Sequence, residues 1–479
     1  MKKLEKRRIR RNRFGSVLSL IGLVISLVVM VGFLRREEVF RLWSEATGET
    51  ANITIDVRPP GRPLTRVWAH LAQGGEDLTT DMLAPVIDQV KSLAPETIRI
   101  DHIYDGYDVV SRNDSGQLVF NWVRLDEVVS SIRKTGATPM LVLSYMPPAV
   151  SRGDIVDLPK DWSEWALTVQ RTVEHYSGAL GIDNVSYEVW NEPDLFGKWK
   201  PYGQKNYLDL YRWSAVGAGR ANGVKRFKLG GPAITAPYDS WLDGLLSLVE
   251  KENLKLDFIS WHRYSKSLDV YYEDSNVIHR AIQKHLATAA GLEWYLTETG
   301  PDSENNPMYD GVSAAAHLAA VNSIALGQIN RVYTFEIVDG RDPAGKIYWG
   351  RWGLMTSPSV GIKIKPRYQV LLMLNRLAGS LIQVSGEGSW VKAIATKKAE
   401  GTVRVFLVNY DQYGRHSEET PVAVTGLTPG GEYSIYRTLL GGGTRSEKVI
   451  ADAPGTVRTI APLAANAVMF IEVTPAGVP

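Results

Sequence analysis

The segment VSYEVWNEPDLFGKW, residues 185–199, contains a mostly apolar run that ends abruptly at Asn191-Glu192-Pro193. A short apolar run of this kind is typical of a strand that is covered on both faces, as in a parallel sheet. A carboxylate directly after such a strand lies at the carboxyl end of the sheet, where α/β proteins place their working residues. The segment therefore predicts a parallel α/β fold with a functional glutamate at one strand end.

Seven similar runs, separated by helical patterns, surround this segment. The expected strands are 66–70, 97–100, 139–144, 186–190, 227–230, 258–261, 294–297 and 331–335. The expected helices are 79–93, 124–135, 162–179, 204–222, 239–252, 276–290 and 312–327, with a last helix at 366–378. Eight such βα units predict a (β/α)8 TIM barrel over residues 52–379.

The pattern changes after residue 379. Residues 380–479 contain short alternating runs, such as TVRVFLVNY (402–410) and EYSIYRTL (432–439), separated by glycine-rich turns. Because this pattern is typical of antiparallel strands, we expect a C-terminal antiparallel β-sandwich over residues 380–479. The stretch NITIDVR (52–58) is expected to add a strand to that sandwich.

The N-terminal region has the features of a membrane anchor. Residues 14–34 carry no charge and are numerous enough to cross a bilayer as a helix at about 1.5 Å per residue. Eight Lys/Arg precede them, which predicts a single-pass topology with the N-terminus in the cytoplasm. We expect a basic tail (1–13), a transmembrane helix (14–34), a stalk (35–51) and an extracytoplasmic body. The alternative is a cleaved signal peptide, whose apolar region is normally about 7–15 residues long.

Charge and composition exclude several classes of function. Residues 1–36 carry ten Lys/Arg and one Glu, whereas the remainder carries 44 Lys/Arg and 51 Asp/Glu. The body is therefore mildly acidic, and nucleic acid is not an expected partner. The absence of cysteine excludes disulfides, thiolate metal sites and cysteine nucleophiles. The sequence has no phosphate-binding loop or dinucleotide fingerprint, so no cofactor is expected.

Several expected strands end in residues that suit chemistry on a sugar. These residues are Arg99, Tyr145, Asn191, Glu192, His262, Tyr264, Glu298 and Glu336. Any one glutamate is more simply explained as a surface or salt-bridged residue, but Glu192 and Glu298 follow the fourth and seventh strands and so face one cleft. Hydrolysis of a glycosidic bond needs such a carboxyl pair, one protonated and one ionised. The amide of Asn191 is suited to hold the sugar 2-hydroxyl beside them.

These motifs resemble glycoside hydrolase family 39, which includes β-xylosidases, α-L-iduronidases and bacterial exopolysaccharide hydrolases. WNEP (190–193) and the second glutamate in WYLTETG (294–300) resemble the catalytic pair of retaining barrel glycosidases. The segments LVLSYMPPAV (141–150), SWHRY (260–264) and WGLMTSPSVGIKIKPRYQVLLMLNRLAG (352–379) resemble further family motifs. The resemblance covers about residues 60–380, and the family is also expected to carry the terminal sandwich.

The resemblance implies a role for each candidate residue. Glu192 corresponds to the general acid/base and Glu298 to the nucleophile, with their carboxyl groups ~5–5.5 Å apart. Further implied contacts are those of Asn191 with the 2-hydroxyl, of Arg99 and Tyr264 with Glu298, and of His262 with Glu192 or the sugar. Tyr145, Trp349 and Trp352 either stack on the sugar or simply pack. An ordinary salt bridge for Arg99 and a structural role for His262 remain alternatives.

Two segments depart from the family pattern. The eighth strand ends in VYTFEIVDG (332–340), with Phe335-Glu336 where a tryptophan is usual, so Trp349 or Trp352 is a candidate replacement. The second strand is followed by Asp101-His102 in place of a single histidine. Both departures alter groups that would contact the sugar and leave the two glutamates intact, so they bear on the substrate rather than on the reaction.

The sequence therefore favours a membrane-anchored retaining glycosidase that acts on a cell-surface or exported polysaccharide or oligosaccharide. Polysaccharide-export machinery is a candidate partner. One alternative is a catalytically silent polysaccharide-binding scaffold on the same fold, which the loss of either glutamate would have favoured. The other is a metal-dependent barrel hydrolase, which needs clustered His and Asp ligands at strand ends, whereas His70 stands alone after the first expected strand.

Overall fold

The computed structural model describes residues 48–75, 81–341, 347–349 and 351–477 of the 479-residue chain. Residues Ala51–Pro479 form one compact unit. The predicted basic tail, the predicted transmembrane helix and most of the predicted stalk lie outside the described residues. Among the helices of the described part of the chain, none has both the length and the apolar character needed to cross a membrane.

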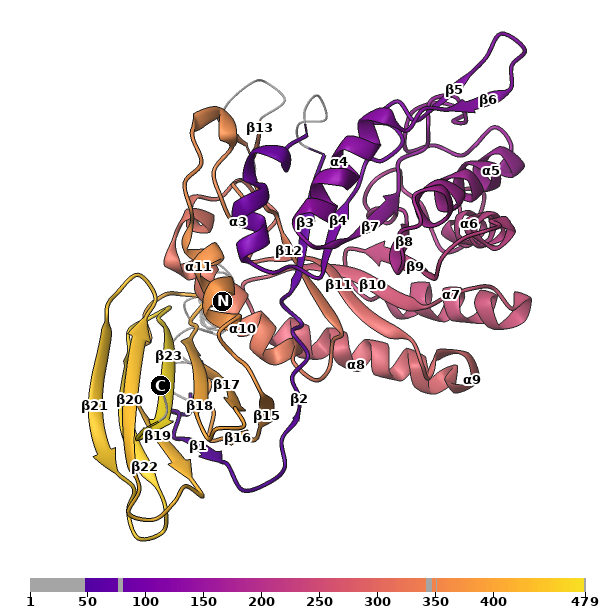
Figure 1. Cartoon of the computed structure of the whole chain (residues 1–479). Helices are drawn as coiled ribbons and strands as arrows, with labels where there is room; N and C mark the ends of the chain where they lie inside the picture. Colours follow the sequence, from indigo (N-terminus) through magenta and orange to yellow (C-terminus); the bar gives the residue numbers. More distant parts are fainter. Residues whose placement is uncertain (1–47, 76–80, 342–346, 350, 478–479) are drawn as a thin grey trace, which may run out of the picture. The chain divides into compact units, whose positions relative to one another are not determined.

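Eight parallel strands close into a barrel in which sequence neighbours pair with one another (Figure 1). They are β3 (His70–Gln73), β4 (Thr97–Ile100), β7 (Thr138–Leu143), β8 (Val185–Val189), β9 (Phe227–Ile234), β10 (Phe258–Tyr264), β11 (Glu293–Gly300) and β12 (Arg331–Phe335). The barrel closes where β12 pairs with β3, with Tyr333 opposite His70. The TIM barrel predicted from the sequence is confirmed.

The first barrel strand lies further along the chain than the expected 66–70. Val67 and Trp68 instead form a turn, in which the amide of Ala69 donates to the carbonyl of Arg66 at 2.9 Å. Val67 and Trp68 are each only 1 % exposed. The run is apolar because it is buried, and a short apolar run does not by itself distinguish an extended from a turned backbone.

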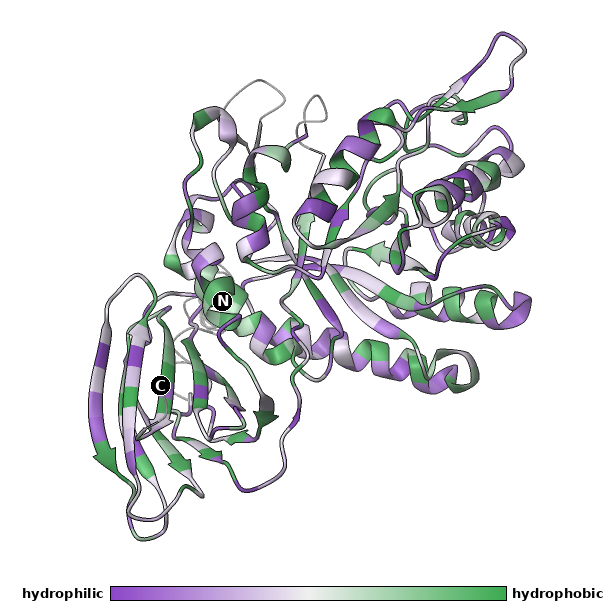
Figure 2. Ribbon diagram, in the orientation of Figure 1, coloured by the Kyte–Doolittle hydropathy of each residue, from purple (hydrophilic) through white to green (hydrophobic). Residues whose placement is uncertain are grey.

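Helices surround the barrel, and hydrophobic and hydrophilic stripes are visible along α7 and α8 (Figure 2). The α-helices are α3 (Ile87–Ser92), α4 (Val123–Lys134), α5 (Trp162–Val173), α6 (Tyr207–Arg220), α7 (Asp239–Glu252), α8 (Asp269–Lys284), α9 (Leu286–Ala289), α10 (Val312–Ala325) and α11 (Pro366–Leu374). Single turns of 3-10 or π-helix are η1 (Ala84–Val86), η2 (Glu174–Ala179), η3 (Pro307–Asp310) and η4 (Pro358–Val360). Helix α8 begins well before the expected 276, and only η1 and α3 occupy the described part of the expected 79–93.

A hairpin that the sequence did not predict projects from the barrel between β4 and α4 (Figure 1). Its strands are β5 (Val110–Arg112) and β6 (Leu118–Phe120). The side chain of Asn113 closes the turn, because its Oδ1 accepts from the amides of Ser115 at 3.0 Å and Gln117 at 2.9 Å. Strands of three residues are too short to give a clear alternating pattern. A second small hairpin pairs β13 (Gly340–Arg341) with β14 (Ile347–Trp349).

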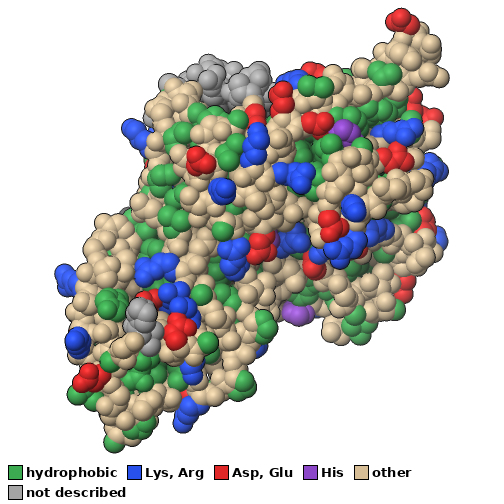
Figure 3. All heavy atoms as spheres, viewed as in Figure 1, with side chains coloured by type: hydrophobic (Ala, Val, Ile, Leu, Met, Phe, Trp, Pro, Cys, Tyr) green, Lys and Arg blue, Asp and Glu red, His purple; other side chains and the backbone are tan. Residues whose placement is uncertain are grey.

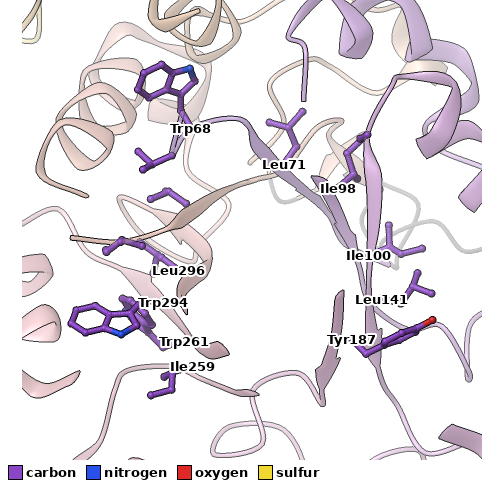
Figure 4. Close-up of a cluster of buried hydrophobic side chains, with 14 of the residues drawn as sticks. Trp68, Leu71, Ile98, Ile100, Leu141, Tyr187, Ile259, Trp261, Trp294 and Leu296 are labelled. Atoms are coloured by element: carbon purple, nitrogen blue, oxygen red, sulfur yellow. The ribbon is translucent and has the colours of Figure 1, made fainter. Parts of the chain in front are cut away.

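The main hydrophobic core lies between the barrel strands and the helices around them. It includes the outward-facing side chains of Trp68, Ile98, Ile100, Leu141, Ile259, Trp261, Trp294 and Leu296 (Figure 4). Successive side chains of a strand point to opposite faces, so Arg99, between Ile98 and Ile100, faces the interior of the barrel. This alternation delivers polar groups to the inside of the barrel while their neighbours stabilise its outside.

Two further sheets involve the C-terminal residues. Their strands are β1 (Ile53–Asp56), β2 (Arg62–Pro63), β15 (Ser380–Ile382), β16 (Val384–Ser385), β17 (Val391–Lys397), β18 (Val403–Asn409), β19 (Glu418–Thr425), β20 (Glu432–Leu439), β21 (Thr444–Ile450), β22 (Val457–Leu463) and β23 (Val468–Pro475). One sheet has the order β16-β1-β19-β22 and the other the order β2-β15-β17-β18-β23-β20-β21. Buried residues of both sheets, such as Ile53, Val405, Val422 and Ile471, belong to one hydrophobic cluster. The extra strand expected at 52–58 is β1.

The surface carries a mixture of charges. On the face shown in Figure 3, acidic and basic side chains are interspersed over the barrel and the C-terminal sheets. Side chains of one charge sign do not gather into a continuous area on this face.

Candidate active site

Glu192 is presented by an unusual turn at the end of β8. Trp190 and Glu192 have positive backbone φ angles of 74° and 42°, a region that non-glycine residues rarely adopt. The amide of Glu192 donates to the carbonyl of Ala233 at 3.0 Å, and the fully buried Trp190 ring packs edge-on against Tyr145, Trp165 and Trp199. Strain of this kind persists only where the surroundings fix it, and it clusters at functional sites.

Glu298 lies in β11 with both carboxylate oxygens bound. Arg99 Nη1 donates to Oε1 at 2.8 Å, and the hydroxyl of Tyr264 donates to Oε2 at 2.8 Å. These are the two contacts that the sequence predicted. Burial raises the pKa of Glu298, while His262 and Arg99 oppose this effect without cancelling it. Donors on both oxygens favour the ionised form of a carboxyl group in a site that would otherwise neutralise it.

The guanidinium of Arg99 binds three side chains of the site. Besides Glu298, its guanidinium donates to Glu188 Oε2 at 2.7 Å and to Asn191 Oδ1 at 2.8 Å, and Arg99 itself is fully buried. Burial disfavours its charge, but nearby carboxylates, led by Glu188 and Glu298, outweigh burial and raise the pKa of Arg99. One permanently charged fork thus fixes Asn191 and Glu298 relative to each other.

His262 lies between the two glutamates. Its Nδ1 is 2.8 Å from Glu192 Oε1 and 3.6 Å from Glu298 Oε2. Burial lowers the pKa of His262, but the carboxylates of Glu298 and Glu192 outweigh burial and leave this pKa raised. The predicted contact of His262 with Glu192 is present, and it orients the carboxyl group of Glu192.

The two carboxyl groups are close together. Ligand atoms of Glu192, His262 and Glu298 lie within 4.8 Å of one another. Carboxyl groups of retaining glycosidases are about 5–5.5 Å apart, whereas inverting enzymes separate them by about 6.5–9.5 Å to admit a water. The same three groups have a spacing that a metal ion can use, but the guanidinium of Arg99, 2.8 Å from Glu298, would repel a divalent cation there. The arrangement therefore suits double displacement better than metal-assisted hydrolysis.

A cavity of about 490 Å³ opens above these groups, which is within the usual range for small ligands. Its polar part is formed by Asp101, His102, Tyr145, Asn191, Glu192, Tyr264, Ser303 and Glu298, and its apolar part by Ile155, Val156, Leu195, Phe196, Phe335 and Trp352, with Gly75 at the edge. A pocket that combines polar groups with aromatic and aliphatic walls suits a sugar, which carries hydroxyl groups at its rim and C–H groups on its faces.

The structure brings six of the predicted site residues to the cavity wall. They are Tyr145, Asn191, Glu192, Tyr264, Glu298 and Trp352. Arg99 and His262 are fully buried behind these residues and contact the glutamates. Neither side chain is therefore placed to contact a substrate directly. Of the two tryptophans considered as replacements, Trp352 lines the cavity, and the side chain of Trp349 lies outside the described part.

Glu336 is not on the cavity wall. It is fully buried, and its Oε2 accepts from Gln73 Nε2 at 2.9 Å. Phe335, the preceding residue, lines the cavity instead. Glu336 follows the last residue of β12, and its side chain is bound by Gln73 instead of facing the cavity. The expected substrate contact of Glu336 is therefore replaced by a link between the ends of β12 and β3.

Two groups of residues were missed by the sequence reasoning. Glu188 lies within β8, where it was treated as part of an apolar run, although a lone glutamate in such a run is a signal for an interior polar site. Leu195 and Phe196, which line the cavity and are 57 % and 44 % exposed, lie in the loop after Glu192. Whether these two side chains reach the cavity depends on how that loop folds. No local sequence pattern indicates the fold of the loop.

Comparison with known proteins shows which family and which relatives the chain is similar to. The family model described as Glycosyl hydrolases family 39 matches residues 51–440. A beta-xylosidase of Geobacillus stearothermophilus is 25 % identical over 322 residues, and one of Caldicellulosiruptor saccharolyticus is 25 % identical over 310 residues. These alignments cover 60 % and 59 % of this chain, and each spans 62 % of the relative.

A solved structure has the same fold. The family 39 enzyme from Xanthomonas axonopodis pv. citri superposes with a TM-score of 0.73 at 19 % identity. The superposition covers 90 % of this chain and 99 % of that one. At this level of identity the likeness extends to the fold and carries no statement about the substrate.

Proposed function

The chain belongs to glycosyl hydrolases family 39, and from this premise we propose that it is a retaining O-glycosidase that works by double displacement through Glu298 and Glu192. The observation that carries the proposal is that one carboxylate oxygen of Glu192 lies within 4.8 Å of one of Glu298, in the wall of a sugar-sized cavity. Both glutamates needed for turnover are present and hydrogen-bonded, which argues against a silent binding scaffold.

In the first step the carboxylate of Glu298 attacks the anomeric carbon. The bond from that carbon to the leaving oxygen breaks, and the carboxylic acid of Glu192 donates its proton to that oxygen. Tyr264 and Arg99 hold the oxygens of Glu298, so that the attacking group is fixed before the substrate arrives. The product of this step is a sugar ester of Glu298 and a free leaving alcohol.

In the second step the ionised Glu192 takes a proton from a water molecule. The resulting hydroxide attacks the anomeric carbon from the side that the leaving group vacated, and the ester bond to Glu298 breaks. Two inversions return the original anomeric configuration. His262, 2.8 Å from Glu192, keeps this carboxyl group in place through both proton transfers.

The proposal extends to substrate and location. Two relatives named beta-xylosidase support a β-linked neutral sugar as the first substrate to test. An N-terminal anchor is supported by the uncharged residues 14–34 and the eight basic residues before them. The anchor holds the body, including the β-sheets over residues 380–479, outside the cytoplasm. There the substrate is a cell-surface or exported polysaccharide. Recovery of the intact chain in the soluble fraction of cells would contradict the anchor.

The test is to incubate the chain with 4-nitrophenyl β-glycosides and exopolysaccharides and to follow the anomeric protons of the first product by NMR. Retention is expected, with the β-anomer appearing before mutarotation. Inversion would exclude the double-displacement mechanism. Binding of a polysaccharide without cleavage of any substrate would instead support the scaffold alternative.

Removal of the Tyr264 hydroxyl is expected to shift the pH profile. Tyr264→Phe deletes a donor to the charged form of Glu298, so the pKa of Glu298 rises further above its already raised value. Because attack requires the ionised form, activity is lost as pH falls through this pKa, and the acid limb of kcat/KM moves to higher pH. At the optimum we expect a loss of about 10- to 100-fold. An acid limb that does not move would show that Tyr264 serves packing alone.

A further inference from the structure

Asp101 lines the cavity but has no role in the two steps of the proposed reaction. It follows β4 directly and is two residues beyond Arg99, so both side chains face the interior of the barrel. Asp101 lines the cavity together with Tyr145, Asn191 and Glu298. It therefore lies in the same cavity as the nucleophile, where the sugar that becomes attached to Glu298 must lie.

The carboxylate of Asp101 has an unused acceptor. Asp101 is 6 % exposed, and its Oδ1 is buried without a hydrogen-bond partner among the described residues. Buried polar atoms are almost always paired, so an unpaired one in a cavity wall points to a ligand that supplies the donor. Sugar hydroxyl groups are such donors, and a carboxylate, which only accepts, can take two of them at once.

The charge of the cavity limits which sugar can supply those donors. Three carboxyl groups line it, from Asp101, Glu192 and Glu298, and no Lys or Arg lines it among the side chains that the structure describes. The nearby guanidinium of Arg99 is fully buried and already donates to Glu188, Glu298 and Asn191. Among the described side chains, a sugar carboxylate in this cavity would thus face Asp101 and Glu298 without a Lys or Arg to pair with.

From these observations we infer that Asp101 is a specificity-determining residue that accepts hydroxyl hydrogens of the sugar bound against Glu298 and rejects uronic acids, so that the substrate class is a glycoside of an uncharged sugar. The inference rests on the proposed function and names its substrate. A uronic acid is rejected because its carboxylate would lie in the same cavity as the carboxylates of Asp101 and Glu298.

The test uses matched pairs of 4-nitrophenyl glycosides that differ only at carbon 6, namely β-glucoside with β-glucuronide and β-galactoside with β-galacturonide. The wild-type chain is expected to prefer the neutral member of the better pair by at least about 100-fold in kcat/KM. Asp101→Asn keeps the shape but exchanges an acceptor for a donor. It is expected to lower kcat/KM for the neutral substrate by about 10- to 100-fold and to reduce the preference at least about tenfold.

Two additions make the result specific. Asp114→Asn, the same exchange at an exposed residue of the β5–β6 turn, is the matched control and should leave both rates unchanged. A series of monodeoxy glucosides then identifies the hydroxyl group that Asp101 binds. Loss of that hydroxyl should lower kcat/KM of the wild-type chain relative to the parent glucoside. The same loss should not lower kcat/KM of Asp101→Asn, which no longer accepts from that hydroxyl. Calorimetric titration with D-glucose and D-glucuronate reads out binding without turnover.

The outcomes separate the inference from the proposed function. Efficient cleavage of a uronide, or an Asp101→Asn variant with an unchanged preference, overturns the role of Asp101 and leaves the glycosidase proposal standing. Failure to cleave any glycoside, together with no binding of either free sugar, overturns the proposed function itself. Cleavage of neutral glycosides with loss of preference in Asp101→Asn supports both.

Discussion

Replacement of Glu298 by glutamine is expected to lower kcat for any cleaved substrate by at least about 10⁴-fold, because the amide has the shape of the carboxylate but is not nucleophilic enough to form the sugar ester. The fold should be unaffected, since glutamine still accepts at the oxygen bound by Arg99 or Tyr264. Rates with a 4-nitrophenyl glycoside measure the effect. Glu304→Gln, at an exposed position shortly after β11, is the matched control and should retain full activity.

Azide assigns the two glutamates to separate roles. With Glu298→Ala, azide can enter the space of the missing carboxylate and attack the anomeric carbon once, which gives a glycosyl azide of inverted configuration. With Glu192→Ala, the sugar ester of Glu298 still forms from a substrate with a good leaving group, and azide then gives a product of retained configuration. The opposite pairing of products would exchange the assigned roles.

Replacement of Arg99 by methionine is expected to destabilise the chain by about 3–5 kcal/mol, because Glu188 remains buried without its partner. Both side chains of this pair are fully buried, and the Nε–Oε2 distance is 2.7 Å. Activity should fall as well, since Glu298 and Asn191 each lose a donor. Urea unfolding followed by tryptophan fluorescence measures the stability, and turnover of the same preparation measures the activity.

The double variant Arg99→Met with Glu188→Leu distinguishes structural from positional roles. Replacing both members of a buried ion pair by apolar groups is often neutral for stability, so most of the lost free energy of unfolding should return. Activity should not return, because the donor to Glu298 is still absent. Recovery of both would mean that Arg99 stabilises the barrel without positioning the nucleophile.

The barrel and its two glutamates could be predicted because they depend on local patterns. Apolar runs of the length of a strand recur with helices between them, and each run ends where the chain must leave the sheet. The contacts of Tyr264 and Arg99 with Glu298 were implied by the family resemblance, and the structure contains both. The family resemblance supplied the roles, and the family is confirmed by the match over residues 51–440.

Other features depend on tertiary structure and could not be predicted. Glu336 and Phe335 are adjacent, and which of them faces the cavity is decided by the course of the chain after β12. Glu188 was hidden in an apolar run because its charge is neutralised by a residue of another strand, Arg99. The expected strand at 66–70 was wrong because burial made a turn look like a strand. For Glu336 and Glu188 the deciding contact is distant in sequence.

Strand β1 has a consequence for how the chain is completed on the ribosome. It pairs in parallel with β19, and the Thr425 hydroxyl donates to the carbonyl of Ile55 across 370 residues of sequence. At 5–20 residues per second the ribosome needs roughly 20–75 s to make that interval. Until residues 384–385 of β16 and then those of β19 emerge, Ile53 and Ile55, which are fully buried in the finished protein, have no sheet to join. The first described strand is thus covered only after the barrel sequence is complete, and a nascent chain that stops after the barrel exposes an apolar strand that precedes the barrel.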